Sequence, residues 1–354
     1  MKKATIQAGS SKAAGKPARK IGIIDVAKKA GVSCAAVSRV LNNGAIRIGA
    51  AKRAAIHKVA QQLHYVPHAG ARRLCRQRTE TIGVVFPNAD SSLAHAYLAE
   101  MLRYIAEVAR RKGYDLLLEF SRNPITTLLD HGRTDGLILI AERDTPSAVF
   151  QAWNDSGMPH MVLGGAFATT KPVFFVDVDV LGGTRAVTQH LVELGHRRLA
   201  FLAGIPSLEK QQGFCEALVM AGIRPQGEWM SMCGLETVGI EKTLADLLKL
   251  PPPERPTAIV ATNDDLAIRI VHALNRRGLR VPTDISVTGF DDIDMAGHSV
   301  PSLTTMQIPL AEMAERGVLH LIGQIESGQR APLACLLPAT LVERESATGV
   351  VDRS

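Results

Sequence analysis

Short apolar runs that alternate with amphipathic segments constrain the fold of this chain more than any other feature of its sequence. Continuous apolar strands between helices are typical of parallel sheets that are covered on both faces. About 275 residues is large for one such sheet, so we expect an α/β core with two lobes. The predicted strands are TIGVVF (81–86), DLLLEF (115–120), GLILI (136–140), HMVLG (160–164), VFFVD (173–177), LAFLAG (199–204), AIVAT (258–262) and ISVTGF (285–290). Predicted helices cover 93–112, 181–194, 211–221 and 265–277.

The charges of the 354 residues are unevenly distributed. The first 78 residues hold 17 of the 41 Lys and Arg residues but only one of the 34 acids, Asp25. The remaining residues carry 24 basic and 33 acidic side chains. This asymmetry indicates nucleic acid or an anionic membrane surface as a partner. Residues 1–20 are basic and lack an apolar stretch, so we expect a disordered tail, with a DNA-contacting arm as the alternative.

Several classes of protein are disfavoured by what the sequence lacks. No apolar run approaches the roughly 20 residues that cross a bilayer, and no secretory signal is evident, so we expect a cytoplasmic protein without a membrane partner. No phosphate-binding, metalloprotease or nucleophile-elbow motif is present, so we predict no enzyme, no catalytic residue and no cofactor. No CxxC pair occurs among the five cysteines, which indicates reduced thiols and no metal site. They are Cys34, Cys75, Cys215, Cys233 and Cys335.

Residues 24–41, IDVAKKAGVSCAAVSRVL, fit two short helices around a tight turn. Gly31 stands where a helix end favours a left-handed residue, and Ser33 follows at a good N-cap position. This is helix-turn-helix spacing, although any helical hairpin could share it. A third helix predicted over 50–63 completes a three-helix bundle, and the surrounding positive charge favours docking on DNA phosphates. The side chains expected to face outward on the second helix are Cys34, Ala35, Ser38 and Arg39.

The run DVAKKAGVSCAAVSRVLN, followed by LHYVPHAGARRL and TIGVVFP, resembles the LacI/GalR family of bacterial transcription regulators from about residue 22 to 345. The resemblance implies an N-terminal all-α helix-turn-helix head over 21–67, a hinge helix over 68–78 and an effector-binding, dimerising core over 79–354. The core is expected to be two-lobed and flavodoxin-like, as in periplasmic binding proteins. The lobes are expected at 79–164 with 292–325, and at 165–291 with 326–345.

The resemblance also implies which residues contact double-stranded operator DNA. Cys34 and Ala35 would take the two main base-reading positions, although Cys34 departs from the Pro or Tyr frequent in the family. Arg39 suits bidentate contact with guanine. Leu74 would wedge into the minor groove from a hinge helix that folds only on DNA; an ordinary linker residue is the alternative. The predicted DNA-binding residues are Ser33, Cys34, Ala35, Ser38, Arg39, Asn42, Tyr65, Arg72 and Leu74.

Effector-binding residues are predicted after the strands of the core. Asn263 and Asp291 follow two strands and suit sugar hydroxyls, although each could instead cap a helix. Tyr97 matches a ring-packing position of the family and could equally pack within its lobe. Where the family carries an Arg that grips the sugar, this chain has Leu208, with Lys210 nearby. A lone lysine suits a carboxylate.

Two stretches favour an acidic effector. KQQGF (210–214) and, weakly, AERDTP (141–146) resemble the gluconate-repressor branch. We therefore expect gluconate or a ketogluconate, with a neutral sugar or no sugar as alternatives. A second departure is the segment at 121–135, which is about ten residues shorter than the helix usual in the family.

The leading hypothesis is a homodimeric repressor of carbohydrate or sugar-acid genes, associated with the nucleoid and released from a palindromic operator by a small sugar-like effector. A co-repressor mode would obey the same thermodynamic linkage with the opposite sign. The rival from another class is a solute-binding or sugar-processing protein with the same two-lobed core. The basic head and the missing export signal count against that rival.

Overall fold

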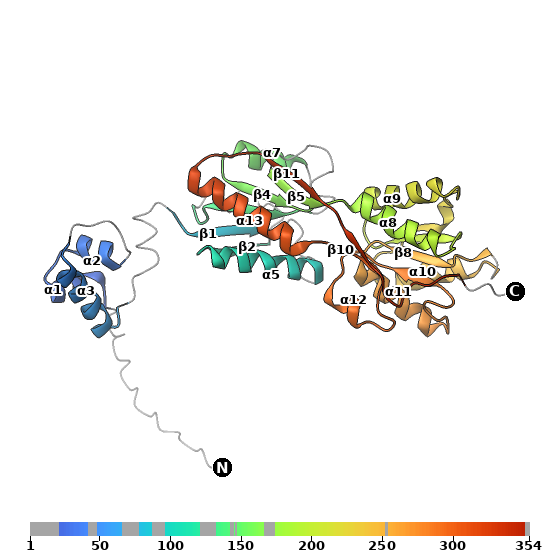
Figure 1. The fold of residues 1–354 in the computed structure, drawn as a ribbon, viewed down its shortest axis with the longest axis horizontal. Coiled ribbons are helices and arrows are strands. Elements are labelled where there is room, and N and C mark those ends of the chain that lie inside the picture. Colours follow the sequence, from blue (N-terminus) through green and yellow to red (C-terminus); the bar gives the residue numbers. More distant parts are fainter. Residues whose placement is uncertain are drawn as a thin grey trace, which may run out of the picture. The chain divides into compact units, whose positions relative to one another are not determined.

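The structure, a computed structural model, describes residues 21–41, 48–65, 78–86, 96–120, 132–141, 145, 147–165, 174–251 and 254–350. These residues form two compact units that meet in sequence between Arg78 and Thr79, and each is described by itself (Figure 1). Except for Arg78, the predicted hinge helix over 68–78 lies outside the described residues.

The N-terminal unit is a bundle of three helices around a small apolar core (Figure 1). The helices are α1 (Ile23–Ala30), α2 (Cys34–Leu41) and α3 (Ala50–Gln62). All three helices were predicted, and the apolar stripes meet as their spacing required. The buried side chains of this core are Val26, Ala27, Val37, Val40, Ile56 and Ala60.

The turn between α1 and α2 has the predicted geometry. Gly31 ends α1 in the left-handed conformation, with φ 65°, which a residue without a Cβ adopts at little cost. The Val32 amide then donates to the Ala27 carbonyl at 3.1 Å. Ser33 caps α2, because its Oγ accepts a hydrogen bond from the Ala36 amide at 3.2 Å. These contacts fix the angle between the two helices.

The first lobe of the core contains a six-stranded parallel sheet with the order β11-β5-β4-β3-β1-β2. Residues of β3 alternate between its faces: Ile138 and Ile140 pack under α5 and α13, while Leu137 and Leu139 pack under α7. The sheet is therefore buried on both sides, as its continuous apolar strands predicted. The strands are β1 (Thr81–Val85), β2 (Asp115–Glu119), β3 (Gly136–Ile140), β4 (His160–Leu163), β5 (Phe174–Val178) and β11 (Leu333–Leu337); the helices are α5 (Ala96–Arg111), α7 (Ser147–Asp155) and α13 (Leu310–Ser327).

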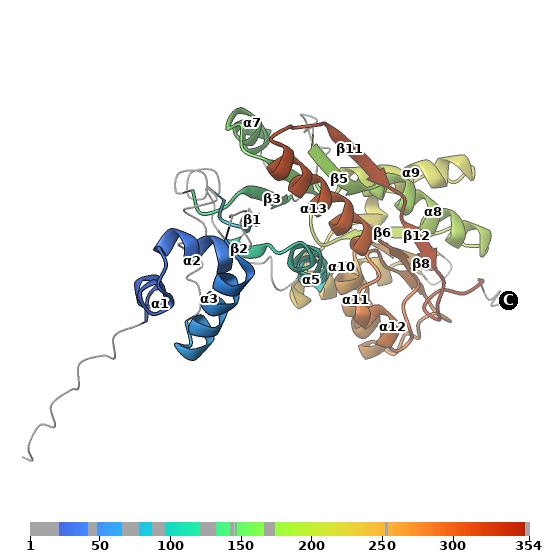
Figure 2. The ribbon, with the colours of Figure 1, turned by 60° about the vertical axis from the view of Figure 1, so that its left-hand side comes forward.

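The second lobe contains a four-stranded parallel sheet with the order β7-β6-β8-β9. Helices α8 and α9 lie side by side on one face (Figure 2), and α10 and α11 cover the other. The strands are β6 (Leu199–Ala203), β7 (Met230–Met232), β8 (Ala258–Ala261) and β9 (Ser286–Thr288); the helices are α8 (Val180–Glu193), α9 (Leu208–Met220), α10 (Thr237–Leu248), α11 (Asp264–Arg276), α12 (Asp294–His298) and a 3-10 turn (Gly227–Trp229). An antiparallel pair, β10 (Thr305–Gln307) and β12 (Thr340–Val342), forms a separate small sheet.

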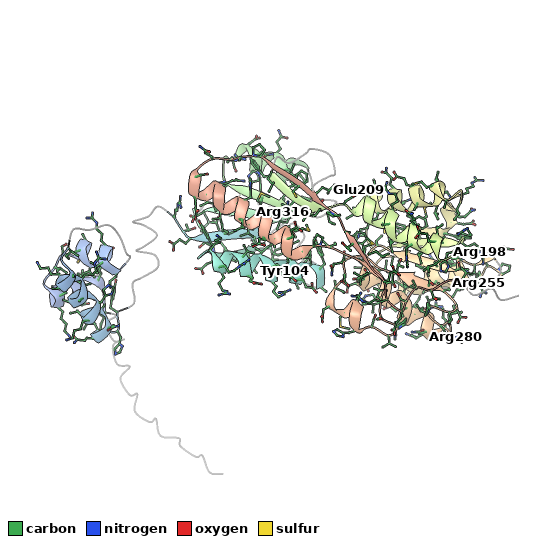
Figure 3. The ribbon with its side chains drawn as sticks, viewed as in Figure 1. Tyr104, Arg198, Glu209, Arg255, Arg280 and Arg316 are labelled. Atoms are coloured by element: carbon green, nitrogen blue, oxygen red, sulfur yellow. The ribbon has the colours of Figure 1, made fainter. Side chains whose placement is uncertain are left out.

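The predicted lobe boundaries were wrong in three places. Strands β5 and β11, expected in the second lobe, pair with each other and extend the six-stranded sheet of the first. Arg316 of α13, which Figure 3 labels, also donates to Cys335 Sγ of β11 at 3.5 Å. Conversely, Ala296 of α12 and Leu303, expected in the first lobe, pack in the second. An apolar run shows that a strand is buried, but its sheet is decided by pairing between residues distant in sequence.

Helices α8 and α9 approach closely at a glycine. A Cβ at Gly213 would overlap the Leu181 carbonyl oxygen and crowd the Arg185 amide. Because both obstacles are backbone atoms of a helix, they cannot move aside as a flexible side chain would. Gly323 of α13 offers a contrast, since nothing lies within 4 Å of a Cβ placed there.

We therefore expect Gly213→Ala to lower the free energy of unfolding by about 1–3 kcal/mol, as overpacking does. Gly323→Ala should raise it by about 0.5–1 kcal/mol, because alanine is the better helix former. Denaturant unfolding of the two variants beside the unchanged chain would measure both effects. A stabilised Gly213→Ala variant would show that the helices can separate without loss.

Candidate functional site

The outward face of α2 carries the predicted base-reading residues. Cys34, Ala35 and Arg39 are exposed on it, and Ser38 is half-buried. Ser33 is exposed at the start of the helix, where it supplies the cap. The predicted DNA contacts Asn42, Arg72 and Leu74 lie outside the described residues.

Tyr65 closes the described part of the head. Its amide donates to the Ala60 carbonyl at 2.9 Å, and its ring packs on the bundle core. Burial raises the pKa of the Tyr65 hydroxyl, and a smaller electrostatic contribution from the nearby Cys34 raises it further. A protonated hydroxyl beside α2 is a suitable donor to a phosphate oxygen.

The described part of the head presents positive charge without opposing acid on its surface. Its acid, Asp25, is used internally, because Oδ2 accepts a hydrogen bond from the Gly22 amide at 2.9 Å. An acid in the first turn also suits the positive end of α1. The exposed cations outside α2 include Lys28, Lys29, Lys52 and Lys58.

A cavity of about 200 Å³ in the core lies where the strands of both lobes end. Residues that follow β3, β4, β6, β8 and β9 line it, as do the first turns of α5, α9 and α11. Parallel strands present their carboxyl ends at one edge, which is where α/β sheets bind ligands. The structure brings all four predicted effector-binding residues to this cavity: Tyr97, Lys210, Asn263 and Asp291.

Asn263 caps α11 and also lines the cavity. Its Oδ1 accepts a hydrogen bond from the Leu266 amide at 2.8 Å, so the capping alternative is correct for the oxygen. The Nδ2 amide is the polar group that remains for a ligand. One side chain thus joins the cavity wall to the start of a helix.

Lys210, near the start of α9, contacts a backbone carbonyl and an aromatic ring. Its Nζ donates to the Thr262 carbonyl at 2.5 Å and lies 3.8 Å from the centroid of the Phe290 ring. A carbonyl and a ring face orient an ammonium group. Lys210 also interacts electrostatically with Asp291, whose pKa it lowers, so the wall of the cavity pairs a basic with an acidic side chain.

Asp291 stands opposite that charge in an unusual backbone conformation, with φ 124°. A non-glycine residue in this region is strained and persists only when its surroundings hold it. Here its amide donates to the Met306 carbonyl at 2.8 Å, and its carbonyl accepts from the Ile308 amide at 3.2 Å. Burial raises the pKa of Asp291 well above its ordinary value, although Lys210 opposes the shift.

Sequence reasoning missed two further carboxylates in the cavity, Asp177 and Asp265. Asp177 is almost fully buried, with 1% of its surface exposed, at the end of β5. It was hidden within the apolar run VFFVD, where the signal was a single acid in an otherwise apolar strand. Asp265 was assigned only to the first turn of a helix.

Behind the cavity wall, Asp264 connects α11 to the segments that run between the lobes. The residue is completely buried. Its Oδ1 accepts from Thr305 Oγ1 at 2.5 Å, and its Oδ2 accepts from the Ile293 amide at 2.9 Å. Burial raises the pKa of Asp264 to about 6, and the two hydrogen bonds act against that shift.

Asp264 should therefore make stability depend on pH. Its folded-state pKa exceeds the unfolded value of about 3.9, so its stabilising contribution is complete below that pH and is lost as pH rises through about 6. Asp264→Asn cannot ionise. We expect its free energy of unfolding, relative to the unchanged chain, to rise by about 2 kcal/mol between pH 4 and 7. A constant difference in denaturant unfolding over this range would show that folding does not shift the pKa of Asp264.

Within the described residues, no helix is long and apolar enough to cross a membrane. The same part of the chain holds no group of His, Cys, Asp and Glu side chains arranged for a metal ion. Its four cysteines are free thiols.

Comparison with known proteins covers both units of the chain. Residues 22–68 match the model of bacterial regulatory proteins of the lacI family, and residues 188–347 match a periplasmic binding protein-like domain. The transcriptional regulator CelR of Thermobifida fusca is 30% identical over 91% of this chain and 96% of its own length. The regulator AscG of Escherichia coli is 32% identical over 88% and 94%.

Solved structures agree with the sequence relatives. A lac repressor dimer bound to operator and the anti-inducer ONPF superposes with a TM-score of 0.80 at 27% identity, covering 93% of this chain and all of that one. A CelR–cellobiose complex gives a TM-score of 0.67 at 28% identity, covering 92% and 100%. With a helix-turn-helix head and a two-lobed core on one chain, this protein belongs to the LacI family and is a DNA-binding transcriptional regulator, not an enzyme.

Proposed function

We propose that the chain is a homodimeric repressor that a small sugar-like effector releases from a palindromic operator on the nucleoid. The observation that carries the proposal is the presence, on one chain, of an exposed recognition face on α2 and a cavity between two lobes that is lined in part by polar side chains. The first suits a DNA groove and the second suits a small ligand. The genes under its control would then serve carbohydrate or sugar-acid metabolism.

On DNA, α2 would enter the major groove of each half-site. Arg39 would pair with a guanine and Ala35 would contact a thymine methyl, while Cys34 would make the third base contact. Ser33, Ser38, Asn42 and Tyr65 would add contacts beside these. The hinge proposed over 68–78 would fold on the operator, with Arg72 on a phosphate and Leu74 in the minor groove.

The described cavity lining favours a hydroxyl-rich effector. Asn263 offers a donor and Asp291 offers acceptors, and Tyr97 lies beside them. Cavities for drug-sized ligands measure about 300–1,000 Å³, so about 200 Å³ suits a monosaccharide better than a longer sugar. Two further acids, Asp177 and Asp265, line the cavity with one described cation, Lys210, and this excess of acidic side chains favours a neutral sugar.

A sugar acid is the second candidate, because Lys210 places an ammonium group in the cavity wall. A carboxylate of gluconate or a ketogluconate would pair with that ammonium group. Either effector can release the operator only by binding more tightly to the DNA-free state of the protein. The opposite preference would make the same ligand a co-repressor.

The DNA proposal predicts that Arg39→Ala weakens binding to a duplex selected from a randomised palindromic library by about 1–3 kcal/mol per half-site, the value of one bidentate base contact. A scrambled duplex should be affected much less. Lys58→Ala, which removes an exposed cation of α3, should weaken both duplexes alike. Gel-shift titrations at fixed salt would measure this, and equal losses in Arg39→Ala would show that Arg39 reads no base.

The effector proposal predicts heat when the full chain is titrated in a calorimeter with glucose, xylose, gluconate, 2-ketogluconate or a phosphorylated sugar. Asp291→Asn should weaken binding of that ligand about tenfold or more, because an amide cannot reproduce the hydrogen bonds of the buried carboxyl group. Heat with acids alone that disappears in Lys210→Met, but not in the surface variant Lys249→Met, would establish the acidic class. Heat with neutral sugars alone would exclude it, and no heat with any of the five would contradict the proposal.

A further inference from the structure

A single carboxylate holds the beginning of the core. Asp135 Oδ1 accepts hydrogen bonds from the Thr79 amide at 2.6 Å and from Thr79 Oγ1 at 2.9 Å. Its Oδ2 accepts from the Glu80 amide at 2.7 Å. Bonds to an ionised acceptor are among the stronger hydrogen bonds in proteins. We call this arrangement of Asp135, Thr79 and Glu80 the clasp.

The clasp holds a backbone conformation that would not persist alone. Glu80 has φ 51°, which is left-handed and unfavourable for a residue with a side chain. Its carbonyl accepts from the Asp115 amide at 2.9 Å, and the Asp135 amide donates to the Thr81 carbonyl at 2.8 Å. Residues 79–81 are thus fixed between β2 and β3, and the clasp supplies the side-chain part of that fixation.

The position of the clasp relates it to both functions of the protein. Thr79 is the first residue of the core unit, so the clasp is the first fixed point after the segment that leads to the head. It lies at the amino end of β1, whereas the effector cavity lies at the carboxyl ends of the strands. Removing the clasp therefore leaves the cavity walls and the base-reading face unchanged.

We propose that Asp135 is a positioning residue for operator binding, which orders Thr79 and Glu80 before DNA arrives. This inference rests on the proposed binding of two heads to one palindrome. A dimer on two half-sites needs both linkers to leave the cores in a fixed direction. Without the clasp, those residues must be ordered on each binding event, and the entropy lost weakens the complex.

The test compares the full chain with Asp135→Ala and the milder Thr79→Val, which removes the Oγ1 bond alone. We expect Asp135→Ala to bind a duplex from the randomised palindromic library about tenfold more weakly, the cost of ordering a residue or two. Binding to a duplex with one half-site should stay unchanged, because one head requires no fixed linker. Thr79→Val should lose less palindrome affinity than Asp135→Ala. Added to Asp135→Ala in a double variant, it should cause no further loss, because the Thr79 hydroxyl already has no Asp135 acceptor there.

Asp284→Ala is the matched control. Asp284 Oδ2 accepts from the Arg280 amide at 2.7 Å and from Arg280 Nε at 3.2 Å, in the second lobe (Figure 3). It should lose comparable thermal stability and keep full palindrome affinity. Unchanged palindrome binding in both clasp variants, or equal losses on half-site and palindrome, would overturn the inference while leaving the proposed function intact. If the unchanged chain selects no duplex from the library, both this inference and the proposed function are overturned.

Discussion

Within each of the two main sheets all strands are parallel. This constraint determines where the cavity and the clasp lie in the core. Parallel strands are joined by helices that return the chain to the starting edge, so one edge collects carboxyl ends and the other collects amino ends. The cavity lies at the first edge, with Asn263 and Asp291 just after their strands. The clasp around Asp135 lies at the second. On the proposed function, a signal from a ligand in the cavity to the clasp would cross the first lobe from one edge of its sheet to the other.

The acids near the cavity show how such a signal could arise. Asp264 and Asp291 are kept in places where burial raises the pKa of each. Both are attached to the same connecting segment, one through Thr305 and the other through Met306 and Ile308. On the proposed function, a ligand that contacts Asp291 would act on this connecting segment.

Local sequence patterns were sufficient for most strands of the two main sheets and insufficient for their assembly; helices such as α7, α10 and α13 were not predicted. Gly31 and Ser33 revealed the turn of the head because a left-handed residue and a cap are requirements of one helix end. Asn263 could be placed at the cavity because it directly follows a strand, and parallel strands end at the edge where ligands bind. The sheet of β5 and β11 could not be predicted, because pairing joins residues about 160 positions apart and leaves no local trace. Asp177 was missed because an acid within an apolar strand shows its role only when the opposite lobe is in place.

The double use of Asn263 limits how the effector specificity of this protein can change. Its oxygen stabilises α11, and the same side chain lines the cavity that we propose binds the effector, so a substitution must meet both requirements. Ser, Thr and Asp keep a capping oxygen, whereas Ala loses about 1 kcal/mol of helix stability together with the ligand contact. Substitutions of Asn263 that change the effector specificity are therefore least costly when the new residue can also cap a helix. Each such residue offers the ligand a different donor or acceptor. The need to cap α11 thereby restricts which effectors could be recognised after a substitution at Asn263.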